Sequence, residues 1–362
     1  MATLKWAPPD RSFVKRIQLG NTVFEGENDV YVLDGETTAL VDTGVALPAV
    51  REELAAGLAE HGLAFADVDA IALTHWHPDH SGLAGEIQAA GGAEVYVHEA
   101  DAGLVDGSET PLFTDPDLQR ETFDRWGMPA ADRERLMGFF ESVSADLGGR
   151  PADVTTFGAG ETVAVGGVAL EAMHLPGHTA GLTGFVVDPR EVPDHDPVAG
   201  ADATEEIFSG DALLPRYTPN VGGADVRVDG PLAAYAESLA RIIERDFDAA
   251  HPGHRERIDE PSLRAATILD HHRHRTRRVI DVLADRESGT AWEVSAALFG
   301  SLEDIHVLHG PGEAFSHLDH LAAAGVVERD GTAYRLVDPD PDVGALFPTT
   351  PLDGVVDGSE DA

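Results

Sequence analysis

The residues best suited to chemistry lie in one short segment, residues 75–80, with the sequence His-Trp-His-Pro-Asp-His. The segment holds three imidazoles and a carboxylate and follows an apolar, strand-like Ile-Ala-Leu run. Imidazole nitrogen and carboxylate oxygen are ligands that zinc and similar divalent ions prefer. Side chains alternate along an extended chain, so His75 and His77 point the same way, while the turn at the proline directs Asp79 and His80 toward a second point nearby. The segment therefore favours two metal ions over one.

Three later segments end strand-like runs with residues of the same kinds. They place His178 in Pro-Gly-His-Thr, Asp211 in Ser-Gly-Asp and His254 in Pro-Gly-His. His251 precedes His254 and competes with it for a ligand position. The alternative is a His-rich surface loop with unrelated histidines elsewhere, because the chain contains 17 of them.

In this order the four segments resemble the motifs of the metallo-β-lactamase superfamily. The resemblance implies that His75, His77 and His178 hold one ion. It implies that Asp79, His80 and His254 hold the other, and that Asp211 bridges the two ions. It favours His254 over His251 as the last ligand and makes Asp79 and Asp211 the catalytic carboxylates. The expected cofactor is a pair of divalent ions, Zn²⁺ in the first place, with Fe or Mn as alternatives.

An Asp-Thr-Gly sequence at residues 42–44 ends the second strand of an expected N-terminal hairpin. It is similar to the first motif of the same superfamily. The resemblance implies that Asp42 lies behind the ligands and orients the loop that carries them. An ordinary aspartate in a turn is the alternative.

The charge balance is strongly acidic, with 65 acidic residues against 25 basic ones and a formal net charge of −40. Lys5 and Lys15 are the only lysines. An acidic surface nearly free of lysine is typical of proteins from salt-accumulating organisms, so we interpret the charge as a halophilic adaptation. It disfavours casual binding to nucleic acids or anionic membranes.

The melting temperature is expected to rise steeply with KCl concentration. The screening length is about 30 Å at 0.01 M salt and about 3 Å at 1 M, so repulsion among carboxylates weakens as salt is added. Thermal unfolding measured between about 0.1 and 2 M KCl tests this expectation. A flat dependence would contradict it.

Other compositional features narrow the class of protein. Cysteine is absent, which excludes disulfides and thiolate ligands. No apolar run reaches the eighteen or so residues that a membrane-spanning helix needs. The first six residues lack the apolar core of a signal peptide, so a cytoplasmic location is expected.

The resemblance implies an α+β architecture with an αββα metallo-β-lactamase sandwich over residues 1–260. Residues 101–150 form a helical insertion that either covers the metal cleft or packs as ordinary core. Residues 188–206 form an acidic loop. Tyr217 and Asn220 follow Asp211 and are candidates for substrate binding at the cleft rim, with a plain loop as the alternative.

Residues 262–338 are predicted to form a small winged-helix domain. A long helix covers residues 262–286, and a capping box at Thr290 opens a second helix. A third helix is expected from about Glu313 to Ala324, followed by a hairpin at residues 326–337. Residues 339–362 are predicted to be an acidic, disordered tail. This layout resembles the branch of the superfamily that carries a C-terminal winged helix.

The favoured function is a metal-dependent hydrolase. A metal-bridging hydroxide would attack the carbonyl of an ester or thioester in a small or carrier-linked substrate. Asp79 would orient the nucleophile and carry its proton. The alternative is a metal-dependent endoribonuclease or phosphodiesterase acting on single-stranded RNA. Its only local basic track is Arg273, Arg275, Arg277 and Arg278, a run more typical of a solvated or interdomain helix face.

Two further functions are less favoured. A DNA-binding regulator would need cationic side chains on its recognition helix, and residues 310–327 contain no lysine or arginine. Sequence-specific DNA and membrane partners are therefore not expected. The C-terminal domain is interpreted as a packing or dimerisation module, which makes a homodimer an expectation. A single-iron dioxygenase is a minor alternative, because imidazole also suits Fe(II).

Overall fold

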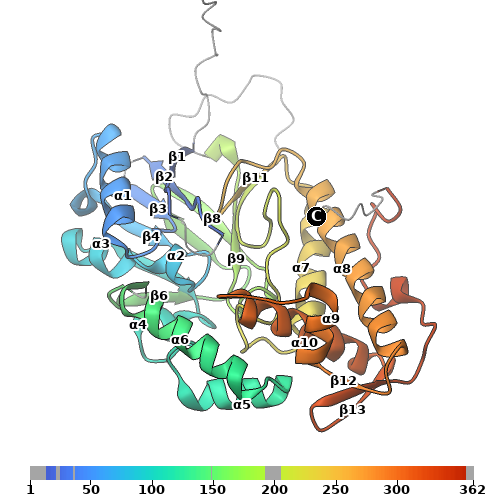
Figure 1. The fold of residues 1–362 in the computed structure, drawn as a ribbon. Helices are drawn as coiled ribbons and strands as arrows, with labels where there is room; N and C mark the ends of the chain where they lie inside the picture. Colours follow the sequence, from blue (N-terminus) through green and yellow to red (C-terminus); the bar gives the residue numbers. More distant parts are fainter. Residues whose placement is uncertain (1–13, 22–24, 36, 148, 192–204, 356–362) are drawn as a thin grey trace, which may run out of the picture.

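Two β-sheets packed face to face form the centre of the molecule (Figure 1). The structure is a computed structural model that describes residues 14–21, 25–35, 37–147, 149–191 and 205–355. The first sheet contains, in spatial order, β1 (Lys15–Gln18), β2 (Asp29–Asp34), β3 (Thr38–Val41), β4 (Ala70–Ala72), β5 (Glu94–His98) and β6 (Val154–Phe157). The second contains β11 (Ala249–Pro252), β10 (Glu206–Gly210), β9 (Thr183–Val187), β8 (Val168–His174) and β7 (Thr162–Val165).

Strand β3 shows why the two faces of the first sheet are both apolar. All four of its residues are buried. Ala39 and Val41 join the core between the two sheets, whereas Leu40 joins the core beneath the outer helices. Successive side chains of a strand point to opposite faces, so a strand covered on both sides needs an unbroken apolar run.

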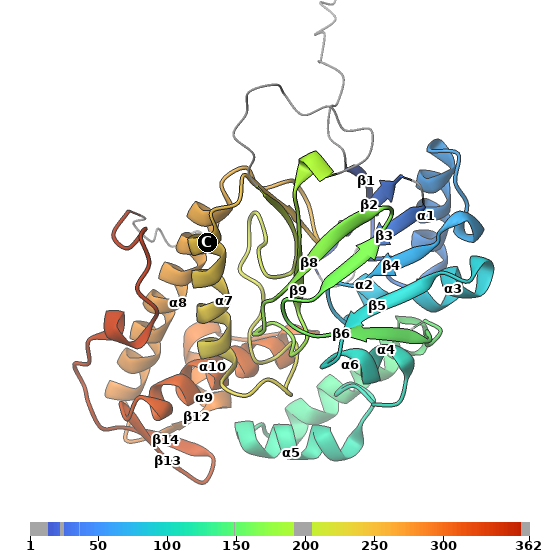
Figure 2. The same ribbon diagram turned by 180° about the vertical axis from the view of Figure 1, so that it is seen from behind.

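Helices cover both outer faces of the paired sheets, as the two opposite views show (Figures 1 and 2). On the first sheet lie α1 (Pro48–Glu60) and α3 (Ala84–Gly91), with the short η1 (Phe65–Asp67) beside α3. On the second lies α7 (Pro231–Arg245), which packs against α8 (Pro261–Ala284). The order of layers is helix, sheet, sheet, helix, consistent with the expected sandwich.

The insertion is helical, as predicted, and consists of α4 (Ala102–Asp106), α5 (Pro116–Trp126) and α6 (Ala130–Leu147). It both packs as core and approaches the cleft. Trp126 and Leu136 are fully buried in the core that also holds the C-terminal helices, whereas Phe140 reaches the cavity described below. The two interpretations of this segment therefore apply to different residues of it.

The C-terminal part contains three helices and a small sheet. After α8 come β12 (Gly289–Thr290), α9 (Ala291–Phe299), α10 (His306–Ala323), β13 (Val327–Asp330) and β14 (Ala333–Leu336), with sheet order β12-β14-β13. The predicted capping box is present, since the side chain of Thr290 accepts from the Glu293 N–H and Glu293 accepts from the Thr290 N–H. The winged-helix interpretation of this arrangement stays a prediction.

Helix α10 begins at His306 rather than at Glu313, so the predicted start was wrong. The Gly310-Pro311-Gly312 sequence lies inside this helix. Proline removes one intrahelical hydrogen bond. The burial of Val307, Leu308 and Phe315 against the rest of the core outweighs that loss.

The tail also differs from its prediction over residues 339–355, which are ordered and include η3 (Val343–Leu346). Val343 and Phe347 are buried in the helical core. Arg273 donates hydrogen bonds to the Pro348 carbonyl at 2.9 Å and to Asp353 at 3.0 Å. Two apolar side chains and one arginine therefore hold a segment whose composition predicted disorder. The predicted tail also includes residues 356–362, which lie outside the described residues.

Two other expectations, the acidic loop of residues 188–206 and the absence of a membrane-spanning helix, are compared only with the described residues. The predicted acidic loop shows η2 (Pro189–Glu191) at its start, and residues 192–204 lie outside the described part. Among the described helices, none combines the length and apolar character needed to cross a bilayer.

Candidate metal centre

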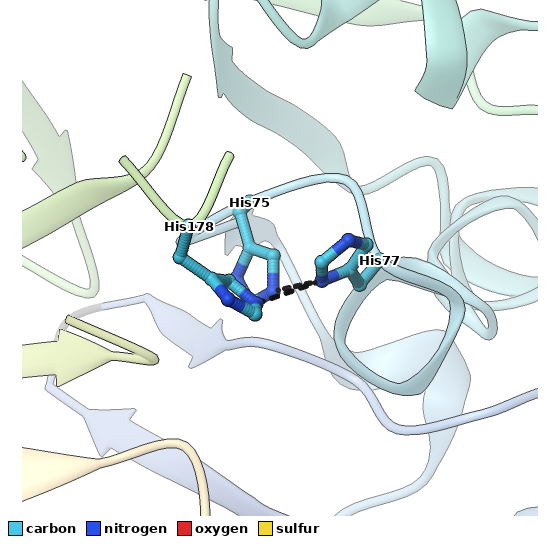
Figure 3. A group of neighbouring side chains, drawn as sticks. All are labelled: His75, His77 and His178. Atoms are coloured by element: carbon cyan, nitrogen blue, oxygen red, sulfur yellow. Dashed lines mark hydrogen bonds between the residues drawn. The ribbon is translucent and has the colours of Figure 1, made fainter. Parts of the chain in front are cut away.

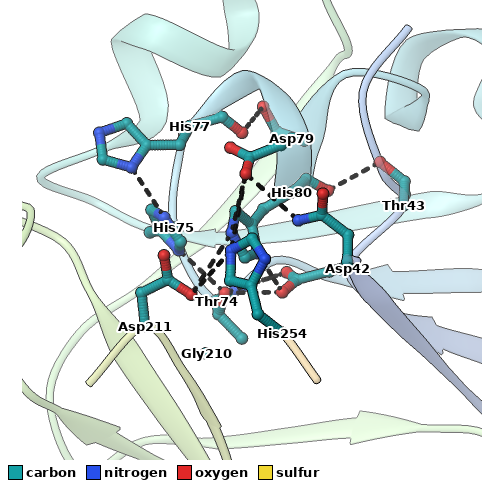
Figure 4. A network of polar contacts seen from close by, with 12 residues as sticks. Asp42, Thr43, Thr74, His75, His77, Asp79, His80, Gly210, Asp211 and His254 are labelled. Carbon is teal, nitrogen blue, oxygen red and sulfur yellow. Dashed lines mark hydrogen bonds and ion pairs between the residues drawn. The ribbon is translucent and has the colours of Figure 1, made fainter. Parts of the chain in front are cut away.

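The predicted ligands come from four strand ends. Those that follow β4, β10 and β11 lie close together in one network of polar contacts (Figure 4). The segment of residues 75–80 follows β4 and includes α2 (Pro78–Ser81). His178 follows β8, Asp211 follows β10 and His254 follows β11. Strands β10 and β11 run parallel, so their carboxyl ends bring Asp211 and His254 together.

Three imidazoles form the first group (Figure 3). The His77 Nδ1 atom lies 2.9 Å from His75 Nε2 and 3.0 Å from His178 Nε2. Ligands that bind a tetrahedral ion at about 2.0–2.1 Å lie about 3.3 Å apart. The three nitrogens therefore have nearly the spacing that one ion requires.

Asp79, His80 and His254 form the second group, and Asp211 lies between the two groups (Figure 4). The Asp79 Oδ2 atom lies 3.8 Å from His80 Nε2 and 3.6 Å from His254 Nε2. Asp211 Oδ1 lies 3.5 Å from His80 Nε2 and 3.4 Å from His254 Nε2. Asp211 Oδ2 lies 3.5 Å from His178 Nε2. One oxygen of Asp211 thus faces each group, which is the geometry of a bridging carboxylate.

Three buried atoms of the second group and of Asp211 lack a hydrogen-bond partner. They are His80 Nε2, His254 Nε2 and Asp211 Oδ1. Leaving a buried polar atom unpaired costs about 1–3 kcal/mol, so three together at one point need an explanation. A divalent ion bound by these atoms provides one, and the chemistry of the donor set fits zinc or a similar ion.

Oxygen acceptors fix the orientation of the ligand rings. In four histidines, the ring nitrogen that faces away from the centre donates to an oxygen. His77 Nε2 donates to Ala224 O at 3.1 Å, and His80 Nδ1 donates to Asp42 at 2.9 Å. His178 Nδ1 donates to Asn220 O and His254 Nδ1 donates to Gly26 O, both at 2.8 Å. Because carbonyl and carboxylate oxygens only accept, these nitrogens carry the proton, and the other nitrogen of each ring presents its lone pair to the centre.

Asp42 occupies the position behind the ligands that the resemblance implied. Its Oδ2 accepts from His80 Nδ1, and its Oδ1 accepts from the Thr74 backbone N–H at 2.8 Å. The Thr74 hydroxyl donates to Asp42 Oδ2 at 2.8 Å and lies 3.0 Å from His75 Nδ1. Asp42 therefore orients a ligand from each group.

Gly253 explains why a glycine precedes the last ligand. A Cβ atom at this position would lie 2.5 Å from His80 Cε1 and 2.7 Å from Asp211 Oδ1. Both distances are too short for contact, so only glycine allows the strand end to approach the other ligands.

The ligand loops are also tied to one another beneath the centre. Asp101 accepts from the Trp76 N–H at 3.2 Å and from the Thr179 hydroxyl at 3.0 Å. Asp225 accepts from the Ala180 N–H at 3.0 Å. Burial, with the nearby Asp225 charge, raises the pKa of Asp101 to about 6. These contacts join the loop of residues 75–80 to the loop of His178.

The two groups differ in electrostatics. Burial lowers the pKa of His75 and of His178, and it lowers the pKa of His77 to about 3, so the first group is neutral. Burial also opposes protonation in the second group, but the Asp211 and Asp79 charges outweigh it and raise the pKa of His80. The same balance raises the pKa of His254 to about 9. Without a metal ion, protons on His80 and His254 therefore supply the positive charge that balances the two aspartates.

A cavity of about 930 Å³, including its open mouth, leads to the ligands. Its apolar walls come from the ligand loops, the insertion and the C-terminal part: Trp76, Leu112, Phe113, Phe140, Leu214, Ile305 and Leu308. His306, His309 and Glu25 are polar residues that also line it. Burial and the nearby Asp211 charge raise the pKa of Glu25.

Sequence reasoning missed Glu25, His306 and His309 as parts of the site. None lies in a motif, and the only available signal was their polar character in segments that fold back onto the cleft. The contribution of residues 305–309 depends on the start of α10, which the sequence placed too late.

The two candidates for substrate binding lie in different surroundings. Tyr217 is 53% exposed, stacks beneath Arg255 and is not among the residues that line the cavity. Asn220 lines the cavity, but its side-chain amide donates to the His309 carbonyl at 3.1 Å. Asn220 instead uses its backbone carbonyl to orient His178. His251, the competitor of His254, pairs with Glu206 at 2.7 Å and not with the cluster.

Comparisons with known proteins agree with this arrangement. Residues 23–189 match the sequence profile of the metallo-beta-lactamase superfamily. The chain therefore contains a metallo-beta-lactamase superfamily domain. A metallo-beta-lactamase family protein from Thermus thermophilus has a similar structure, with a TM-score of 0.71, 27% identity and coverage of 90% of this chain and 98% of that chain. A beta-lactamase domain protein from Burkholderia ambifaria shares the fold, with a TM-score of 0.70, 22% identity and coverage of 90% and 91%.

The sequence relatives of this chain include a probable metallo-hydrolase and a thioesterase. The probable metallo-hydrolase YqjP of Bacillus subtilis (strain 168) is 27% identical, over 82% of this chain and 88% of its own length. The atrochrysone carboxyl ACP thioesterase of Aspergillus chevalieri is 23% identical, over 81% of this chain and 73% of its own length. These identities leave the specific activity to be argued from the site.

Proposed function

We propose that the chain is a metal-dependent hydrolase that cleaves an ester or thioester bond of a small or carrier-linked acyl substrate. The observation that carries this proposal is the cavity, whose apolar walls lead directly to Asp79, Asp211, His178 and His254. Pockets for small molecules combine apolar walls with a few converging polar groups, and this one has that composition. An acyl chain would lie against these walls, with its carbonyl at the ligands.

The residues of the site would divide the work as follows. Two bound divalent ions would bring the pKa of a water molecule near neutrality and polarise the carbonyl oxygen. Asp79 lines the cavity, and Asn28 Nδ2 donates to its Oδ2 at 3.2 Å, which fixes the carboxylate. Asp79 Oδ1 would then orient the attacking water and accept its proton. Glu25, whose pKa is raised, would return a proton to the leaving group.

Similarity to a thioesterase from Aspergillus chevalieri supports a carrier-linked thioester as substrate. Residues 112–113 of the insertion and Ile305, His306, Leu308 and His309 of the C-terminal part line the cavity. Both segments lie outside the sandwich and would set the length and shape of the acyl group. We propose Zn²⁺ as the resident ion, because the two groups offer five histidines and two aspartates.

The RNA-cleaving alternative receives less support. The arginines of α8 that would form its basic track are mostly engaged within the protein: Arg273 with Pro348 and Asp353, Arg275 with Glu313, and Arg278 with the Leu298 carbonyl. Among the described residues that line the cavity, none is a lysine or an arginine. A phosphodiester backbone would therefore meet few cations.

The proposal is tested by comparing substrates with the metal-loaded protein in concentrated KCl. Acyl thioesters of pantetheine with short and long chains are assayed beside single-stranded RNA and a β-lactam. We expect metal-dependent thioester hydrolysis that chelation abolishes and that the longer acyl chains favour. RNA cleavage that exceeds thioester hydrolysis would overturn the proposal in favour of the alternative.

Phe140→Ala should impair long acyl chains more than short ones. Phe140 is buried and lines the cavity, so its loss removes roughly 1.5–3 kcal/mol of apolar contact, or about tenfold to hundredfold in kcat/KM for a long chain. Phe139→Ala is the matched control, because Phe139 is its neighbour in α6 and does not line the cavity. Equal effects of the two changes on all chain lengths would contradict the acyl pocket.

A further inference from the structure

The loop of residues 220–224, between β10 and α7, orients two ligands of the first group. The Asn220 carbonyl accepts from His178 Nδ1 at 2.8 Å, and the Ala224 carbonyl accepts from His77 Nε2 at 3.1 Å. These bonds leave His178 Nε2 and His77 Nδ1 facing the ion position. The placement of this loop therefore determines where two of the three imidazoles point.

Helix α10 of the C-terminal part accepts hydrogen bonds from that loop. Glu313 Oε2 accepts from the Val221 backbone N–H at 3.2 Å and lies 3.4 Å from Asn220 Nδ2. Asn220 Nδ2 also donates to the His309 carbonyl at 3.1 Å, while Asn220 Oδ1 accepts from the Gly223 N–H at 3.0 Å. Both ends of the Asn220 side chain are thus used to fix the loop.

Loop and helix meet backbone to backbone at two glycines. A Cβ atom on Gly312 would lie 2.3 Å from Gly223 Cα and 2.5 Å from Gly223 N. Neither atom can retreat without moving the loop. The Gly-Pro-Gly sequence in α10 therefore has a packing reason, which is this close approach.

Glu313 is itself held from the other side by α8. Its Oε1 accepts from Arg275 at 2.9 Å, and the side chain is 4% exposed. Burial would raise the pKa of Glu313, but the Arg275 charge and a bond from His317 outweigh it and keep that pKa below its usual range. Glu313 is therefore an ionised bridge from α8 to the loop.

His272 and His317 approach the same carboxylate, at 3.7 and 3.5 Å from Glu313 Oε1. These separations would also suit ligands of a metal ion. Arg275 already supplies the positive charge at that oxygen, so the cluster is balanced without an ion. We therefore interpret this cluster as a support for the loop of residues 220–224 and not as a metal site.

We infer that Glu313 is a positioning residue for the first metal group: it holds the loop of residues 220–224 so that His77 and His178 present their lone pairs to one ion. The inference rests on the metal centre of the proposed function and adds that the C-terminal part belongs to its outer support. Outer partners of metal ligands typically contribute tenfold to hundredfold in metal affinity.

Two variants test the inference in the full-length chain. Glu313→Gln removes the charge that holds the loop. Asn220→Ala removes the bonds of the loop side chain to Glu313, His309 and Gly223 without touching Arg275. Glu328→Gln is the control, because Glu328 lies in β13 of the same part and pairs with Arg335 on the surface. Each protein is freed of metal and titrated with Zn²⁺ against a chromophoric chelator, with no substrate present.

We expect the wild type and Glu328→Gln to bind two ions per chain with the same affinities. Both test variants should bind one ion about tenfold to hundredfold more weakly and the other unchanged, and excess Zn²⁺ should restore turnover. The double variant should show less than the sum of the two losses, since both act through one contact. If Glu313→Gln does not fold, Asn220→Ala alone decides.

Three results would overturn the inference. They are unchanged affinities in both variants, an equal loss at both sites that follows a lower melting temperature, and a third ion per chain that His272→Ala removes. A wild type that binds no metal would instead reject the proposed function, so the two failures are distinguishable.

Discussion

Replacing Asp211 with alanine is expected to abolish turnover and to leave fewer than two tightly bound ions per chain. Asp211 faces the second group with Oδ1, at 3.4–3.5 Å from His254 and His80, and the first group with Oδ2, at 3.5 Å from His178. Losing an outer partner of a metal ligand costs about 10–100-fold. A carboxylate shared by both groups should cost more than that range in kcat/KM.

The measurement combines metal analysis with thioester turnover in concentrated KCl. Asp211→Asn keeps the shape and one oxygen, so it should retain the fold while still losing the bridge. His251→Gln is the matched control, because His251 is a buried histidine on β11 that bonds Glu206 and not the cluster. Full turnover with two ions in Asp211→Ala would refute the bridging role.

Metal binding should release protons from the second group and none from the first. Burial opposes protonation of His254, but the Asp211 and Asp79 charges outweigh it and raise its pKa to about 9. The pKa of His80 is raised in the same way. An ion that binds these imidazoles must displace their protons, so we expect these two histidines to release about two protons per chain at about pH 7.5, in addition to the proton lost from metal-bound water.

The imidazoles of the first group are already neutral, so an ion that binds them displaces no proton. Burial lowers the pKa of His77 to about 3 and also lowers that of His75. Calorimetric titration of the metal-free protein in buffers of different ionisation enthalpy gives the number of protons for each step. His254→Ala should remove one proton from the second step. Binding heats that do not depend on the buffer would contradict the assignment.

The same shifts predict how the metal-free protein responds to pH. His254 has a folded pKa of about 9 against an ordinary value of 6.5, so its protonation stabilises the fold fully below pH 6.5. That contribution is lost as the pH rises through 9. The loss is roughly 1.4 kcal/mol per pH unit for each such proton. Thermal unfolding should show this decline without metal and little of it with Zn²⁺ bound.

Local patterns predicted many elements well. The apolar spacing of Val50, Leu54 and Leu58 is typical of one helix face, and all three side chains are buried in α1. The capping box at Thr290 predicted the start of α9. These signals lie within one helix, so no distant partner is needed to interpret them. Helix α10 and residues 339–355 were predicted wrongly, because long-range burial overrides a proline and an acidic composition there.

Residue types and their spacing in the sequence predicted the candidate metal ligands. Imidazole nitrogens and carboxylate oxygens are ligands that divalent ions prefer, so their clustering in short strand-to-loop segments can be recognised without the rest of the chain. Tertiary structure decided the rest of the site. The atoms that orient His77, His178 and His254 are the backbone carbonyls of Ala224, Asn220 and Gly26. Every residue has a carbonyl, so no residue type in the sequence marks these three.

The walls of the cavity also depend on tertiary packing. Phe140, Ile305 and Leu308 are ordinary apolar residues in the sequence, and they line the site only because the insertion and α10 fold over the sheet edge. Glu313 likewise reaches the loop of residues 220–224 across 92 positions of chain, through its bond to the Val221 N–H. Ligand identity is a property of side-chain chemistry and local geometry, whereas orientation and substrate shape arise from contacts between segments that only the packed core brings together.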